Sequence, residues 1–428
     1  MSTFDKVIGY EATKQELLQI CDMIRNKEFY QDFGASLPQG MLLYGDPGLG
    51  KTLLAKCFIE ESGLPSYLIR RTKSSEDFVN EIATTFQKAK EQRTPAIVFL
   101  DDMDKFANED YAHCDAEAYV AVQAGIDLVK NCDVFVLATA NDLYKLPESL
   151  RRAGRFDRKI ELLCPSEQDA CEIIKHYLKD KKVSEDVKLD DLAMMITYSS
   201  CAELETLLNE SAIRAAYLRH ESITMEDLVE AVLKKEYAAQ DNLIKTSQEE
   251  LQRIALHEAG HLVVSEVLSP GSVGFASLRT KGRDSTGGFV RRCKKITNNP
   301  YQIMISMGGK AAEELYYADR YVDGCQGDIS KAIELIRNAV SEQATCGIGL
   351  VDVETRNTPV MSENLNSRNE AVVQAELDRF LLETKAILFK NKEFLERVQS
   401  ALLEKETLLY SDIQSIRDSI KITRVSVL

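Results

Sequence analysis

Met41-Leu42-Leu43-Tyr44 leads directly into Gly45-Asp46-Pro47-Gly48-Leu49-Gly50-Lys51-Thr52, and Leu53-Leu54-Ala55-Lys56 follows. The middle segment fits the pattern Gly-x-x-x-x-Gly-Lys-Thr between an apolar run and helix formers, which is the context of a phosphate-binding loop. Glycines let the backbone wrap around a phosphate, and amides at a helix start point at the anion. Lys51 would reach the outer phosphates, and Thr52 would offer its hydroxyl to Mg²⁺. The residues predicted to bind the nucleotide are Gly45, Asp46, Pro47, Gly48, Leu49, Gly50, Lys51 and Thr52.

The surrounding sequence alternates strand-sized apolar runs with helix-length segments, which is typical of a parallel sheet with crossover helices. The runs are Met41–Tyr44, Tyr67–Ile69, Ala96–Leu100, Val134–Ala138 and Lys159–Leu163. Two carboxylates follow the third run directly. Asp101 would hold Mg²⁺ through water, and Asp102 would orient or activate the attacking water. We therefore predict an α/β sheet that carries a nucleotide site.

The strand signal disappears after residue 165. Helical spacing over Cys201–His220 and Thr224–Leu233 predicts a small helical subdomain. The polar segment Gln240–Gln248 has no clear periodicity and is predicted to be a linker.

The remaining sequence is mostly helical in pattern. A Gly/Ser-rich segment, Ser269–Gly288, interrupts it ahead of a possible strand at Phe289–Arg292. The chain is thus predicted to be multidomain, with an α/β subdomain and its flanking helices, a small helical subdomain and a mainly α-helical domain. Their predicted ranges are 1–165, 166–240 and 247–428.

Composition argues against two classes of protein. A net charge of −15 disfavours a protein whose main task is to bind nucleic acid, because phosphates require a basic face. No stretch approaches the roughly 18 consecutive apolar residues that cross a bilayer, so no membrane insertion is expected.

The first residues, Met1–Lys6, lack the charged and apolar blocks of a secretory signal, so a cytoplasmic location is expected. The ten cysteines include no Cys-x-x-Cys pair, which favours reduced thiols.

His257-Glu258-Ala259-Gly260-His261 is the clearest motif in the second half of the chain. Flanking apolar residues predict a helix, on which residues four apart share a face, so both imidazoles can bind one metal ion. Glu258 would take a proton from the attacking water and pass it to the leaving amine. A hydrolytic zinc site needs a third protein ligand, which sequence spacing does not identify.

The first half of the chain resembles the AAA family of hexameric ring ATPases. Leu137-Ala138-Thr139-Ala140-Asn141 looks like the family's sensor strand, which implies that Asn141 contacts the γ-phosphate of ATP or its water. Ser149–Arg158 resembles the second region of homology. That resemblance implies that Arg152 and Arg155 act on a neighbouring subunit's nucleotide, and that the chain is a homo-oligomer in a hexameric ring.

Two positions depart from this family. The family usually has Glu where this chain has Asp102, and the shorter carboxylate predicts slow turnover, since small misplacements can cost about 100-fold. The central-pore loop of substrate-threading relatives carries aromatic-aliphatic-Gly, whereas Ser74–Asn80 is shortened and lacks the glycine. Phe78 and Val79 are the candidates for that loop, and strong unfolding power is not expected.

The segment after about Ser247 looks like the peptidase domain of FtsH-type ATP-dependent zinc proteases, and the first half resembles the same family. Gly327-Asp328-Ile329 lies where that family has its ligand aspartate. The resemblance implies that the zinc ligands are His257, His261 and Asp328. Met307–Leu315 is similar to the family's Gly-Gly-x-x-Ala-Glu-Glu helix. Its Glu313 or Glu314 is the alternative third ligand, or a residue behind the ligands.

Further expectations come from the same resemblance, which runs from Val7 to about Ile416 and omits the family's membrane segments. The chain is therefore expected to be a soluble form or a fragment of a longer protein. Gly287–Arg291 would be an exposed edge strand on which an extended substrate pairs. The C-terminal helices, including Glu404–Leu408, would serve assembly.

These predictions favour an ATP-dependent zinc metalloprotease that hydrolyses ATP to engage polypeptide substrates and deliver them to the zinc site. Its cofactors would be ATP, Mg²⁺ and Zn²⁺. An AAA chaperone or remodelling ATPase with vestigial proteolysis is the alternative, which Asp102 and the altered pore loop support. A third interpretation is a peptidase of loosely folded proteins whose ATP site mainly holds the ring together.

Overall fold

The computed structural model divides the chain into two compact units. It describes residues 2–72, 75–92, 94–106, 116–130, 132–197, 199–239, 247–279, 287–317, 324–341 and 363–424. The first unit comprises Met1–Lys179 and Tyr198–Thr206, and the second comprises Asp180–Thr197 and Leu207–Leu428. Of the predicted linker Gln240–Gln248, all but the last two residues lie outside the described residues. The predicted division into three parts stays a prediction.

The first unit is built on a parallel sheet of five strands. Its order is β2-β3-β4-β1-β5, with parallel pairing throughout. The strands are β1 (Gly40–Tyr44), β2 (Ser66–Ile69), β3 (Ala96–Leu100), β4 (Val134–Ala140) and β5 (Arg158–Glu161). All five predicted strands are confirmed, although β4 runs two residues further than predicted and β5 ends two residues earlier.

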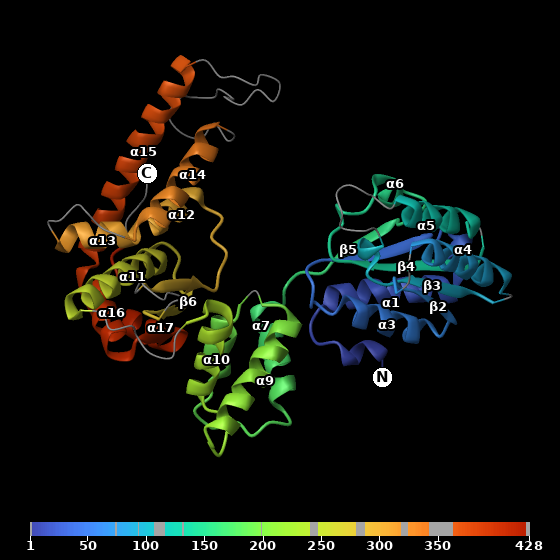
Figure 1. Ribbon diagram of the computed structural model, residues 1–428, viewed down its shortest axis with the longest axis horizontal. Helices are drawn as coiled ribbons and strands as arrows, with labels where there is room; N and C mark the ends of the chain where they lie inside the picture. Colours follow the sequence, from blue (N-terminus) through green and yellow to red (C-terminus); the bar gives the residue numbers. More distant parts are fainter. Residues whose placement is uncertain are drawn as a thin grey trace. The chain divides into compact units, whose positions relative to one another are not determined.

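Helices cover both faces of this sheet (Figure 1). Strand side chains alternate between the faces, so that on β1 Met41 and Leu43 pack on one side and Leu42 on the other. The helices packed with Met41 are α1 (Glu11–Arg25) and α3 (Lys51–Ser62). Those packed with Leu42 are α4 (Ser75–Glu91) and α5 (Ala116–Leu128). Shorter elements are η1 (Thr3–Lys6), α2 (Lys27–Asp32), η2 (Met103–Lys105) and α6 (Glu148–Arg151), and α7 (Glu167–Leu178) follows the sheet.

The assignment of Phe78 to a pore loop is wrong. Phe78 lies on α4, is fully buried, and meets the ring of Phe106 edge-on at 4.9 Å. The physical reason is the spacing of Phe78, Ile82 and Phe86, four residues apart on one face of the helix that covers the sheet. Val79 is only partly buried, next to the same core.

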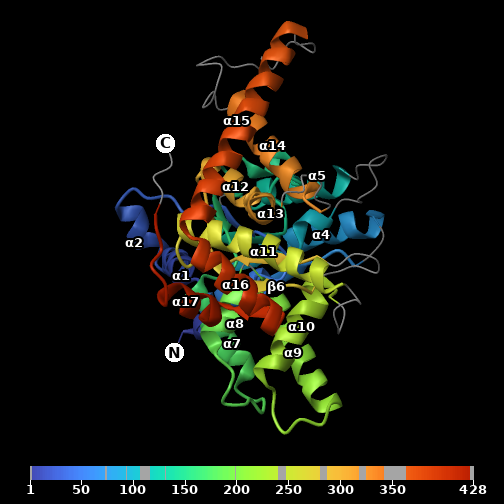
Figure 2. The same cartoon turned by 90° about the vertical axis from the view of Figure 1, so that its left-hand side faces the viewer.

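The second unit is mainly helical and surrounds the long helix α11 (Gln248–Leu268). α11 lies between α13 and α16, with which it shares its largest packed surfaces (Figure 2). The other helices are α8 (Leu189–Met195), α10 (Met225–Tyr237), α12 (Asn299–Ser306), α13 (Gly308–Tyr316), α14 (Gln326–Ser341), α15 (Glu363–Lys390), α16 (Lys392–Lys405) and α17 (Tyr410–Asp418), with most of α9 (Cys201–Tyr217).

A small antiparallel sheet, in the order β7-β6-β8, packs against α11. It consists of β6 (Val273–Ser277), β7 (Phe289–Arg292) and β8 (Thr407–Leu409). The possible strand at Phe289–Arg292 is therefore confirmed. Two features differ from expectation, because β6 lies inside the Gly/Ser-rich segment and β8 replaces the end of a predicted C-terminal helix. That helix stops at Lys405, since Glu406 takes a left-handed conformation with φ of 58°.

No helix within the described ranges is both long and apolar enough to cross a bilayer.

Candidate nucleotide and metal sites

The glycine-rich loop lies between β1 and α3, at the carboxyl end of the sheet. Gly45, Gly48 and Gly50 have φ values of 140°, 83° and 83°, which other residues rarely adopt. A Cβ on Gly45 would also lie 2.2 Å from the carbonyl oxygen of Leu162. The sequence of the loop is therefore required by its backbone shape.

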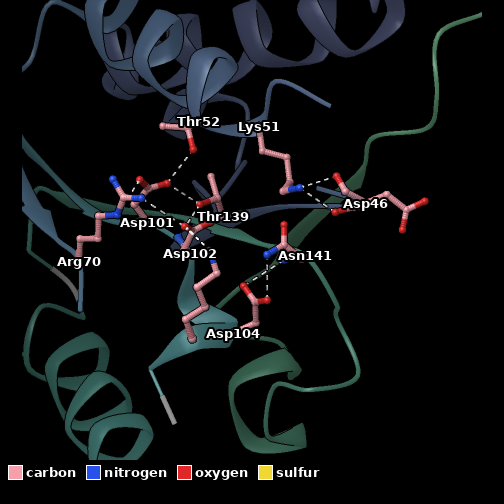
Figure 3. A network of polar contacts seen from close by, with 11 residues as sticks. Asp46, Lys51, Thr52, Arg70, Asp101, Asp102, Asp104, Thr139 and Asn141 are labelled. Atoms are coloured by element: carbon pink, nitrogen blue, oxygen red, sulfur yellow. Dashed lines mark hydrogen bonds and ion pairs between the residues drawn. The ribbon is translucent and has the colours of Figure 1, made fainter. Parts of the chain in front are cut away.

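Lys51 begins α3 with its side chain folded over the loop (Figure 3). Its Nζ donates to the carbonyl oxygens of Gly45 and Asp46, both at 2.7 Å. Burial lowers the pKa of Lys51, against the attraction of nearby carboxylates that include Asp104 and Asp102. A buried ammonium group at the start of a helix suits a polyphosphate.

Thr52 and Asp101 converge beside this lysine (Figure 3). The Thr52 hydroxyl donates to Asp101 Oδ1 at 2.9 Å, and the Thr139 hydroxyl donates to the same oxygen at 2.8 Å. Thr139 in turn accepts from the backbone N–H of Asp102 at 2.9 Å. A hydroxyl and a carboxylate at hydrogen-bonding distance are donors that Mg²⁺ prefers, so this pair fits the metal that accompanies ATP.

Asp102 follows in a left-handed conformation, with φ of 54°. Its Oδ2 lies 2.9 Å from Lys105 Nζ and 3.5 Å from Arg70 Nη2. The carboxylate expected to orient water is thus paired with two cations of its own chain.

Asn141 is held by a residue that the motifs did not single out, Asp104 (Figure 3). Asp104 Oδ1 accepts from the backbone N–H of Asn141 at 3.0 Å, and Oδ2 accepts from its side-chain amide at 3.1 Å. The signal for Asp104 was only its place in Asp101-Asp102-Met103-Asp104, two residues beyond the carboxylate pair.

Arg152 and Arg155 both meet carboxylates of their own chain. Arg152 pairs with Glu148 at 3.2 Å and its side chain is 68% exposed. Arg155 pairs with Asp127 at 2.9 Å and donates to the carbonyl oxygen of Ser149. A role for either residue on a neighbouring subunit stays a prediction.

In the second unit, α11 places His257 and His261 one helical turn apart with their rings turned inward. The two Nε2 atoms are 3.0 Å apart. Asp328, on α14, brings its Oδ2 to 3.1 Å from His261 Nε2 and 3.3 Å from His257 Nε2. The donors of a tetrahedral zinc ion with bonds of about 2.0 to 2.1 Å lie roughly 3.3 Å apart, so these three atoms fit zinc.

The other ring nitrogens are fixed from behind. His257 Nδ1 lies 2.8 Å from Glu313 Oε1, and His261 Nδ1 lies 2.7 Å from the carbonyl oxygen of Ile305. Such contacts orient imidazoles toward a metal. Glu314 instead pairs with Lys310 at 2.8 Å and with Lys385 at 2.5 Å. Of the two glutamates that the sequence left open, Glu313 is therefore the one at the histidines.

The charges of the cluster also suit a cation. Burial would raise the pKa of Asp328, but its contacts with His257 and His261 hold that pKa well below the usual range. Burial would lower the pKa of His257, but its hydrogen bonds with Asp328, Cys325 and Glu313 raise it. A positive charge at this place is favoured by its surroundings.

Glu258 is the acidic residue of the motif and is not among the three donors. It is 6% exposed and lines a cavity of about 910 Å³ together with both histidines, Asp328 and Gly288. Burial raises the pKa of Glu258, against the nearby imidazoles, which lower it. A carboxylate of raised pKa beside a metal site is suited to carry protons.

Glycines bring the backbone close to this cluster. A Cβ on Gly309 would lie 2.3 Å from the His257 ring, and a Cβ on Gly260 would lie 2.3 Å from the carbonyl oxygen of Gly308. α11 and α13 therefore cross at a distance that only glycine allows, which is a role that the sequence motifs alone did not reveal.

Two known families match this chain, one in each of its two halves. Residues 41–163 match the family model "ATPase family associated with various cellular activities (AAA)", and residues 244–416 match "Peptidase family M41". The chain is 33% identical over 439 residues to "ATP-dependent zinc metalloprotease FtsH" of Leptotrichia buccalis, covering 96% of this chain and 56% of that protein. It is 31% identical over 440 residues to the protein of the same name from Streptobacillus moniliformis, covering 96% and 64%.

A further relative is matched over more of its length. The chain is 31% identical over 448 residues to "ATP-dependent zinc metalloprotease FtsH 2" of Symbiobacterium thermophilum, covering 97% of this chain and 74% of that protein. The chain thus spans little more than half of the first of these relatives and about two thirds to three quarters of the others.

Proposed function

Because this chain belongs to the FtsH family of ATP-dependent zinc metalloproteases, we propose that it hydrolyses ATP and cleaves polypeptides at a zinc site of its own. The observation that carries the proposal is the meeting of three metal donors, His257 Nε2, His261 Nε2 and Asp328 Oδ2, within 3.3 Å of one another. Two of them come from one helix turn, and the third comes from a helix distant in sequence. Chance rarely supplies a donor set that fits one tetrahedral ion.

His257, His261 and Asp328 would hold the zinc ion, with Glu313 orienting His257. When bound, zinc polarises the scissile carbonyl and lowers the pKa of water. Glu258 would accept a proton from the attacking water and donate it to the leaving amine. Its burial supports this role, since burial raises the pKa of Glu258 and makes its carboxylate a better proton acceptor.

β7 would hold the substrate. It is one of the two edge strands of its sheet, and the cavity that contains Glu258 is lined by Gly287, Gly288, Phe289, Val290 and Arg292. An extended peptide can pair with the free edge of such a strand, with main-chain hydrogen bonds supplying affinity.

The first unit would bind ATP and Mg²⁺ through the loop Gly45–Thr52 and Asp101. Asp102 and Asn141 would position the attacking water, with Asp104 holding Asn141. Arg152 and Arg155 would act on a neighbouring subunit in a homo-oligomeric ring, which we take to be a hexamer. ATP hydrolysis would then drive delivery of polypeptides to the zinc sites.

A chaperone or remodelling ATPase with weak proteolysis remains the second candidate function. Two observations favour it over a strong unfolding protease. Phe78 lies in the core rather than in a pore loop, and Asp102 is paired with Lys105.

Cleavage of casein separates these functions. Wild-type protein should cleave casein in the presence of ATP, and Glu258→Gln should bind zinc but lose cleavage. Lys51→Ala should lose the ATP-dependent part only. Equal cleavage by Glu258→Gln and wild type would overturn the protease assignment, and zinc-free protein from unchelated preparations would overturn the metal site.

A further inference from the structure

β7 is attached to α10 by the side chains of one of its faces. Phe289 and Arg291 are two residues apart and therefore point to the same side of the strand. The Phe289 ring stacks on the Tyr237 ring, with centroids 3.8 Å apart and planes 10° apart. The Phe275 ring of β6 lies against both, at 5.5 Å from Phe289 and 6.3 Å from Tyr237. An aromatic cluster thus joins the end of α10 to the sheet.

Arg291 reinforces this attachment. Its guanidinium forms an ion pair with Glu236 and donates to Tyr237 Oη at 3.2 Å and to the carbonyl oxygen of Thr197 at 2.7 Å. The side chains of Arg291 and Glu236 are only 20% and 21% exposed, so water competes weakly for their bonds. One side chain therefore holds the strand to two separate points of the helical segment.

The other end of β7 leads to the catalytic carboxylate. Gly288 directly precedes Phe289, and its backbone lies against the side chain of Glu258. A Cβ on Gly288 would lie 2.3 Å from Glu258 Cγ, so the backbone is as close to Glu258 as glycine permits. Any displacement of Phe289 must move Gly288 against or away from that side chain.

We propose that Tyr237 and Glu236 of α10 are positioning residues for peptide-bond cleavage, which hold β7 and thereby set the place of Gly288 against Glu258. This inference rests on the proposed protease function. We call the contacts of Tyr237 and Glu236 with β7 the clamp. Because α10 belongs to the helical segment that follows the nucleotide-binding sheet in sequence, the clamp makes the peptidase site depend on that segment. The edge that receives the substrate and the carboxylate that transfers the proton are fixed by the same contacts.

Substitution of Tyr237 in the full chain tests the clamp. Tyr237→Leu removes the stacked ring, Tyr237→Phe keeps it, and Tyr217→Leu on α9 is a matched control because Tyr217 is 82% exposed. On a short fluorogenic peptide, which needs no unfolding, Tyr237→Leu should lower kcat about 10-fold or more. Tyr237→Phe should recover most of the loss, and Tyr217→Leu should behave as wild type. Zinc content should be equal in all four proteins.

Amide hydrogen exchange over residues 287–292 supplies a second readout that needs no activity. Exchange there should be faster in Tyr237→Leu than in wild type and Tyr237→Phe, with the exchange of α11 unchanged. Wild-type kcat and wild-type exchange in Tyr237→Leu would overturn the clamp, as would a loss of kcat that follows a loss of zinc or of the thermal transition. A wild-type protein that binds zinc but cleaves nothing would overturn the proposed function instead, and exchange would still decide the clamp.

Discussion

Replacing Gly309 by alanine sets two physical effects against each other. Gly309 is the second residue of α13, and alanine in a helix is normally more stable than glycine, by up to about 1 kcal/mol. Its added carbon, however, would lie 2.3 Å from Nε2 and Cε1 of His257 and 2.5 Å from Cδ2. Carbon atoms in contact prefer about 3.5 to 4.0 Å, so the His257 ring would have to retreat by roughly 1 Å.

A shift of that size should weaken zinc binding more than it affects the helix. His257 Nε2 is one of the three donors, and productive metal–ligand distances tolerate changes of only about 0.2 Å. The ring cannot simply turn over, because its Nδ1 is held by Glu313 at 2.8 Å. We therefore expect Gly309→Ala to lower zinc affinity by about 10-fold to 100-fold, the effect of disturbing residues that orient zinc ligands.

The assay is zinc content by elemental analysis after dialysis against a competing chelator, with the thermal transition of the zinc-free protein measured in parallel. Gly327→Ala is a matched control, because Gly327 is the second residue of α14 and a Cβ there meets no described atom within 4 Å. The control should retain zinc as wild type does. If Gly309→Ala also retains zinc as wild type does, the steric argument fails and helix propensity alone describes the position.

Three more predictions concern the metal, the nucleotide site and α10. Added zinc should raise the Tm of chelator-treated wild-type protein, since ligand that binds only the folded state stabilises it, and should leave His261→Ala unchanged. Asp104→Ala should lower the kcat of ATP hydrolysis about 10-fold without weakening ADP binding, because both Asp104 oxygens orient Asn141; an unchanged steady-state rate would refute this role. Burial would raise the pKa of Asp227, but hydrogen bonds from His220 and Thr224 hold that pKa below the ordinary 3.8. The ionised Asp227 therefore stabilises the fold above pH 3.8, and this stabilisation is lost as the pH falls from 3.8 through the lowered pKa of the folded state. Asp227→Asn should thus lower stability by roughly 1 to 2 kcal/mol at pH 7, and melting curves at successively lower pH should show the difference closing.

Local patterns predicted the first unit well. The three inner strands of its sheet, β1, β3 and β4, are continuous apolar runs that are almost wholly buried, so composition alone identified them. The phosphate loop was predictable from its sequence, because Gly45, Gly48 and Gly50 adopt positive φ angles that glycine adopts readily.

Local patterns failed where a segment is shaped by distant parts of the chain. The sequence of β6 lies within a Gly/Ser-rich segment that predicts an interruption of the helical pattern, but it forms a strand. Gly274 is needed in this strand because a Cβ there would lie 2.4 Å from the carbonyl oxygen of Met194. Phe78 reads as a loop aromatic, but the sheet and Phe106 bury it. Likewise, β8 forms only because β6 offers it a partner.

The sequence by itself determined the two chemistries, since the phosphate loop and the pair of histidines are each complete within one strand–helix junction or one helical turn. Tertiary structure decided what surrounds them. Asp328 lies 67 residues from His261 and Asp104 lies 37 from Asn141, and only folding brings each pair to about 3 Å. The physical reason is that a helix or strand fixes the relation of neighbours in sequence, whereas contacts between elements depend on how their buried faces pack.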